Sequence, residues 1–174
     1  RLQLRNLGIS ESEYDVLYVD GPISSDRPGP GIAELEELVP GPWYSWLPDD
    51  DAVWADGPAL CNAICDAVEY VLSILQNYGP FDAVFGFSQG GLIANLVNGL
   101  STDQALISAL QQRSISCPLP NGIPFNAAVI ACAGSSLPLP ELRLKAELGP
   151  APQASPQIHS LHLIGREDDY RPWS

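Results

Sequence analysis

Apolar residues recur at helical spacing between Pro58 and Tyr78. Positions three or four apart along this segment lie on one face of a helix, and here they are Leu60, Ile64, Val68, Val71, Leu72 and Leu75. Gly79-Pro80 follows directly and cannot continue the helix. The pattern therefore predicts an amphipathic helix over 58–78.

Short, continuous apolar runs predict strands elsewhere. They are "YDVLYVDGP" at 14–22, "FDAVFGF" at 81–87, "FNAAVIACAG" at 125–134 and "QIHSLHLIG" at 157–165. Leu- and Ala-rich segments at 90–100 and 102–113 predict two more helices. Strands that are apolar on both faces and separated by helices indicate a mainly parallel sheet with helices on both faces. The 174 residues predict a single α/β domain.

Residues 21–58 interrupt this alternation. They are dense in Pro, Gly and Asp, and they hold the "WYSW" stretch at 43–46 and Trp54. A long irregular excursion of this kind is typical of a lid or binding loop. Trp43, Tyr44 and Trp46 either form the wall of a substrate pocket or pin the loop to the core, and we predict them as substrate-binding residues.

The charge balance narrows the partners. With 8 Lys and Arg against 21 Asp and Glu, the formal net charge is −13, which disfavours nucleic acid and anionic lipid surfaces. No run approaches the roughly 18 uninterrupted apolar residues of a membrane span, and residues 1–20 lack the pattern of a signal peptide. We therefore expect a soluble, cytoplasmic protein that binds no nucleic acid.

The cysteines and the acidic run do not indicate a metal site. None of the four cysteines forms a CxxC pair. Cys61 and Cys65 lie one helical turn apart, where an apolar helix uses cysteine as a small buried residue. The consecutive carboxylates at 49–51 lack the alternating spacing of a calcium loop and are typical of a solvated turn. We expect no metal.

The stretch "FDAVFGFSQGG" at 81–91 carries the candidate chemistry. A predicted strand runs into Gly-Phe-Ser-Gln-Gly and then into a predicted helix, which favours a nucleophile elbow over a serine in an ordinary turn. In such an elbow Gly86 and Gly90 avoid steric clashes, Ser88 is the nucleophile, and the N–H of Gln89 is an oxyanion-hole donor.

Several stretches together resemble the FSH family of serine hydrolases. They are "YGPFDAVFGFSQGG", the preceding "YVDGP", the "WYSW" loop and the later "LHLIGREDD", so the similarity runs from about residue 14 to 172. The resemblance implies an α/β-hydrolase fold and a Ser-Asp-His triad. The triad would hydrolyse small-molecule carboxylic esters or thioesters without a metal or organic cofactor.

The resemblance also implies the position of the acid. "LHLIGREDDYRP" lies where the family has a Gly-x-x-Asp pattern after a strand. Matching Gly165 to that glycine selects Asp168 as the acid that orients the imidazole. Asp169 is the next candidate and Glu167 the third.

The base is the missing member of the triad. The chain contains only His159 and His162, and both lie inside the last predicted strand, before the acid. His162 would be up to ~20 Å from Asp168 in extended chain, whereas a general base contacts its partners at roughly 3 Å. In the family the histidine follows one further helix beyond the acid.

The amino-terminal end lacks a second family feature. Residues 1–16, "RLQLRNLGISESEYDV", contain no Leu-His-Gly-like turn of the kind with which the family builds part of its oxyanion hole. We therefore expect residues 1–174 to be a fragment of one hydrolase domain, with the triad histidine beyond it and little activity alone. The alternatives are a non-catalytic binding or scaffold form of the same fold, and an acyltransferase or lipid hydrolase.

Overall fold

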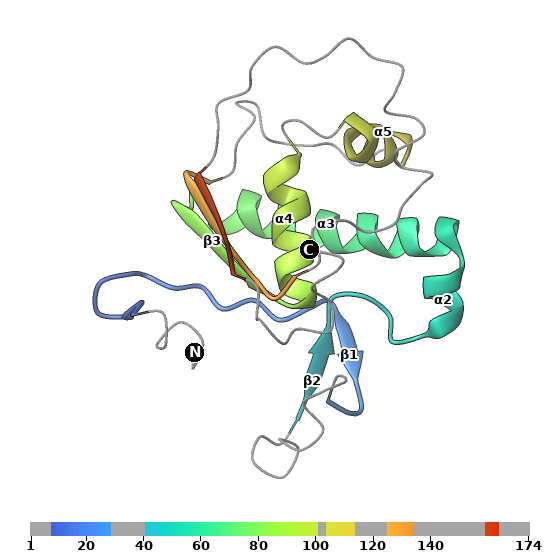
Figure 1. Cartoon of the computed structure of the whole chain (residues 1–174), viewed down its shortest axis with the longest axis horizontal. Coiled ribbons are helices and arrows are strands. Elements are labelled where there is room, and N and C mark those ends of the chain that lie inside the picture. Colours follow the sequence, from blue (N-terminus) through green and yellow to red (C-terminus); the bar gives the residue numbers. More distant parts are fainter. Residues whose placement is uncertain (1–7, 29–40, 101–103, 114–124, 134–158, 164–174) are drawn as a thin grey trace.

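A parallel sheet with helices packed against it forms the centre of the molecule (Figure 1). The structure is a computed structural model that describes residues 8–28, 41–100, 104–113, 125–133 and 159–163. The sheet contains β3 (Ala83–Phe87), β4 (Ala127–Ala131) and β5 (His159–Leu163) in that order. Both pairs are parallel, and Phe87 lies in register with Ala131 and Leu163. The predicted α/β class and the three later strands are confirmed.

Three helices were also predicted, and all three are present. They are α3 (Gly57–Tyr78), α4 (Gln89–Gly99) and α5 (Gln104–Gln112). Pro58 occupies the first turn of α3, where its missing N–H costs nothing, and Gly79 caps the end. Helix α5 is attached to α3 by Arg113, whose guanidinium contacts the Asp66 carboxylate and donates to Asn62 at 3.0 Å.

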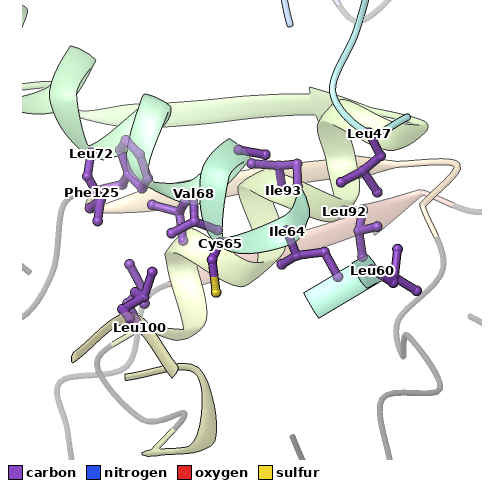
Figure 2. Close-up of a cluster of buried hydrophobic side chains, with 13 residues drawn as sticks. Leu47, Leu60, Ile64, Cys65, Val68, Leu72, Leu92, Ile93, Leu100 and Phe125 are labelled. Atoms are coloured by element: carbon purple, nitrogen blue, oxygen red, sulfur yellow. The ribbon is translucent and has the colours of Figure 1, made fainter. Parts of the chain in front are cut away.

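The hydrophobic core lies between α3 and α4 (Figure 2). Helix α3 contributes Leu60, Ile64, Cys65, Val68 and Leu72, and α4 contributes Leu92, Ile93 and Val97. Burying a Leu or Ile side chain stabilises a fold by about 1.5–3 kcal/mol, so this interface accounts for much of the packing. Leu47 joins the cluster from a loop that precedes α3 and is fully buried.

Helices pack against one face of the sheet, whereas side chains on the other face are exposed. Val84, Ala128 and Ile130 face α4 and cluster with Ala94. Side chains in the alternate positions point the other way, and there Phe87 and Leu161 are exposed. Within the described ranges, helices therefore cover only one face, and the predicted cover on the second face is not represented among these residues.

The predicted strand at 14–22 is wrong. Residues 15–20 are mostly exposed and form no β ladder, and Tyr14, Leu17 and Tyr18 are exposed hydrophobic residues. A strand needs a neighbour to pair its backbone groups, and in the described part of the chain this segment has none. Its β-favouring composition therefore gives an extended stretch without strand pairing.

The excursion at 21–58 is more regular than predicted. Strand β1 (Ile23–Ser25) pairs antiparallel with β2 (Trp43–Ser45), and we call this pair the hairpin. The short helix α2 (Asp51–Ala55) follows, and the Asp50 carboxylate caps it by accepting from Ala52 N–H at 2.9 Å. The acidic run at 49–51 therefore starts a helix at the surface.

Helix α3 is long and apolar enough, by length and composition alone, to cross a membrane. Its apolar positions Leu60, Ile64, Val68 and Leu72 are however buried against the rest of the domain. A core helix of a folded domain has the same composition, so we assign α3 to the core.

Candidate active site

Ser88 lies on a sharp turn between the end of β3 and the start of α4. Its backbone has φ 52° and ψ −124°, a conformation that L residues rarely adopt. It is the N-terminal cap residue of α4, yet its hydroxyl makes no capping hydrogen bond. A serine at this position usually caps its helix. Ser88 is instead an exposed residue at the helix N-terminus.

Glycines make this turn possible, although not quite those predicted. A Cβ at Gly86 would lie 2.5 Å from the Gly90 carbonyl oxygen and 2.6 Å from Gly91 Cα. A Cβ at Gly91 would lie 2.8 Å from Ala133 Cβ and 3.1 Å from the Gly86 carbonyl oxygen. The close backbone approach between strand and helix thus needs Gly86 and Gly91. At Gly90 a Cβ would instead meet the Trp46 indole, at 3.1 Å from Nε1.

The sheet fixes the turn from the other side. Ser88 N–H donates to the Ala131 carbonyl oxygen at 2.9 Å, and Cys132 N–H donates to the Leu163 carbonyl oxygen at 2.8 Å. The parallel ladder therefore continues one step beyond the strands. Cys132 also has a positive φ, 51°, and is exposed. The neighbouring ends of β3 and β4 both carry strained, exposed residues.

The helix N-terminus at this turn is suited to bind a negative charge. The first N–H groups of a helix have no intrahelical partner, and the positive end of the helix dipole lies there. Gln89 N–H is the first of these groups after Ser88. The Gln89 side chain has a separate partner, because its Oε1 accepts from Trp46 N–H at 3.2 Å.

The predicted substrate-binding aromatics occupy different environments. Trp46 is close to Gly90 and to Tyr70, with ring centroids 6.2 Å apart at 57°. Tyr44 is 47% exposed in the middle of β2, and Trp43 is half-buried at its start. The segment lies beside the Ser88 turn, because the hairpin is close to the N-terminal end of α4 (Figure 1). Of the three, Trp46 makes the contacts with the turn.

The structure describes the two histidines, and neither lies at the Ser88 turn. Asp168, with Glu167 and Asp169, lies outside the described residues. His159 pairs with Ala127 at the far end of the sheet from the turn. His162 is in register with Ile130, which pairs with Gly86, so its Cα lies two strand spacings, about 10 Å, from that of Gly86.

The two cysteines of α3 are packed, as predicted. Cys65 is fully buried, and Cys61 is partly buried one turn before it. Burial, together with Cys61, raises the pKa of the Cys65 thiol to about 11. Among the described residues no group of His, Cys, Asp and Glu side chains is arranged to hold a metal ion.

The sequence did not reveal that Cys132 lies at the end of β4, next to Ser88 at the end of β3. Cys132 follows the apolar run of β4 just as Ser88 follows that of β3, and this shared position after paired strands was the available signal. The cysteine count alone did not reveal that it is exposed beside the candidate nucleophile.

Cys132 is expected to react with iodoacetamide at pH 8 while Cys65 stays unmodified. The thiolate is the reactive form, and both burial and its raised pKa keep Cys65 protonated until the pH approaches 11. Peptide mapping by mass spectrometry after timed alkylation measures both rates, with the chain unfolded in guanidinium as the reference. Equal rates for Cys65 and Cys132 in the folded chain would contradict the packing described here.

Comparison with known proteins adds a family to this geometry. The family described as serine hydrolase (FSH1) matches residues 3–173. Esterase OVCA2 of Bos taurus is 38% identical over 74 residues, which cover 42% of this chain and 33% of that protein. Esterase FUS5 of Gibberella fujikuroi is 31% identical over 77 residues. These residues cover 44% of this chain and 31% of the length of that protein.

A third relative is hydrolase phiM of Talaromyces stipitatus, 36% identical over 77 residues, which cover 42% of this chain and 27% of that protein. The matched stretches thus span about a third of these curated relatives. No solved structure is significantly similar to the chain.

Proposed function

Because the chain belongs to the FSH1 family of serine hydrolases, we propose that it carries the nucleophile and the acid of an esterase. Ser88 attacks the carbonyl carbon of a carboxylic ester or thioester, and Asp168 orients the histidine that takes the serine proton. The histidine lies outside residues 1–174. The reaction needs no metal or organic cofactor.

One observation carries the proposal: the backbone conformation of Ser88. A positive φ between a parallel strand and a helix N-terminus is costly, about 1–3 kcal/mol, and Gly86 and Gly91 are required to allow it. That geometry exposes the hydroxyl without capping the helix. It fits a nucleophile elbow, in which the serine is held clear of its own backbone.

The same geometry suggests how the intermediate is stabilised. When Ser88 Oγ bonds to the carbonyl carbon, the carbonyl oxygen becomes an oxyanion, and Gln89 N–H donates to it at the positive end of α4. The histidine then protonates the departing alcohol or thiol. Water, deprotonated by the same histidine, cleaves the resulting acyl-serine and releases the acid.

The substrate and the location belong to the same proposal. Relatives named as esterases support a small-molecule ester, and the formal charge of −13 argues against a polyanionic partner. Cys61, Cys65 and Cys132 are free thiols, which supports a reducing compartment such as the cytoplasm.

Comparing residues 1–174 with a longer protein tests whether the proposed histidine lies beyond residue 174. We expect residues 1–174 alone to show almost no labelling of Ser88 by a fluorophosphonate probe and almost no hydrolysis of an activated ester. A longer protein with the carboxy-terminal segment that supplies the histidine should show both. Strong labelling of the shorter chain would overturn the assignment of the base to a residue beyond it.

The longer protein also separates the alternatives. An unreactive Ser88 there would support the non-catalytic binding form over the esterase. If it is reactive, a panel of esters, thioesters and glycerolipids with water or an alcohol as acceptor distinguishes a hydrolase from an acyltransferase or lipid hydrolase.

A further inference from the structure

The hairpin is fastened to the Ser88 turn through the residues that follow β2. Trp46 N–H donates to Gln89 Oε1 at 3.2 Å, and this bond joins segments 43 residues apart. The Trp46 indole lies against Gly90. A Cβ at this position would be only 3.1 Å from Trp46 Nε1, which is tighter than an ordinary contact. Leu47, the next residue, is fully buried in the core. Two adjacent residues therefore anchor one side of the hairpin.

The other side of the hairpin is held as closely. Gly21 is buried just before β1, and a Cβ there would lie 2.3 Å from the Ser45 carbonyl oxygen. Ile23 pairs with Ser45 in the two-stranded sheet. Both strands of the hairpin are therefore held near residues 45–46. The position of the hairpin thus depends on the contact between Trp46 and Gln89.

We propose that the Gln89 side chain is a positioning residue, which sets the place of the hairpin beside Ser88 and through it the ester substituents that the site accepts. This inference rests on the proposed function. Gln89 acts at two points: its N–H is directed to the oxyanion, and its Oε1 holds Trp46. Gln89 thus supplies the backbone donor to the oxyanion and, through its side chain, holds the hairpin beside Ser88.

Two substitutions separate the hydrogen bond from the size of the side chain. Gln89→Met keeps the length but removes the acceptor, whereas Gln89→Glu keeps an acceptor oxygen for Trp46 N–H. Both retain the backbone N–H. Gln76→Met, at an exposed position near the end of α3, is the matched control for adding a thioether.

Amide hydrogen exchange of residues 43–47 tests the positioning without any need for activity. Loss of this part-buried bond should speed exchange of the Trp46 amide about threefold to tenfold in Gln89→Met. Gln89→Glu and Gln76→Met should match the unsubstituted chain. Unchanged exchange in Gln89→Met would overturn the proposal.

The effect on substrate acceptance is tested by steady-state kinetics of the longer protein. The substrates are p-nitrophenyl esters of increasing chain length. Gln89→Met should raise KM for the longer esters about tenfold while kcat falls less, because the hairpin has moved relative to Ser88. Gln89→Glu should lower kcat for all esters alike and leave KM unchanged, because a carboxylate beside the oxyanion opposes its charge. Equal KM in all variants would contradict the role in specificity. If the unsubstituted longer protein hydrolyses no ester, the proposed function fails, and the exchange result still decides whether Gln89 positions the hairpin.

Discussion

Replacing Ser88 by alanine in the protein that includes the triad histidine is expected to abolish fluorophosphonate labelling. It should also lower kcat for ester hydrolysis by at least about 10⁴-fold, because removal of the nucleophile of a triad leaves only binding and oxyanion stabilisation. The loss should appear in kcat more than in KM, since in the proposed mechanism the hydroxyl bonds to the substrate only in the reaction itself. Steady-state kinetics and probe labelling measure it.

The structure also predicts that this variant folds. The Ser88 hydroxyl makes no capping bond and is exposed, so its loss should leave the thermal midpoint within about 2 °C of the unsubstituted protein. Ser160→Ala, at an exposed position of β5, is the control and should retain labelling and activity. Residual labelling of Ser88→Ala would mean that another residue is the nucleophile.

Periodicity sufficed for the elements that pack in the core. The helical spacing from Leu60 to Leu75 predicted α3, and the apolar runs predicted β3, β4 and β5. In α3 and β4 the buried residues are the apolar ones of the pattern, so local pattern and tertiary structure agree. The Gly-Phe-Ser-Gln-Gly motif identified the Ser88 turn for a similar reason, since its steric needs are local.

Features that depend on a distant partner escaped prediction. The run at 14–22 has the composition of a strand, but strand formation depends on a neighbouring edge that the sequence does not reveal. Trp46 was predicted either to form the wall of a substrate pocket or to pin its loop to the core, and the sequence did not reveal its partner Gln89, 43 residues away. The role of Gly91 likewise depends on Ala133, which follows β4.

Gly86→Ala is expected to disrupt the Ser88 turn more severely than any other small substitution near it. The added methyl would lie 2.5 Å from the Gly90 carbonyl oxygen and 2.6 Å from Gly91 Cα, and both are backbone atoms that cannot rotate away. The strand end and the helix must therefore separate. We expect the free energy of unfolding to fall by about 1–3 kcal/mol or more, measured by urea denaturation, and Ser88 labelling to be lost in the longer protein.

Gly99→Ala supplies the matched control, because it adds the same methyl group to the other end of α4. Among the residues that the structure describes, nothing lies within 4 Å of a Cβ at Gly99, so alanine there should leave stability unchanged or raise it by up to about 1 kcal/mol through its higher helix propensity. Ser88 labelling should persist. If the two variants unfold at the same urea concentration, strand and helix do not approach as closely as described. If Gly86→Ala is destabilised but keeps full labelling, the reactivity of Ser88 does not depend on the tight turn, and the observation on which the proposed function rests loses its force.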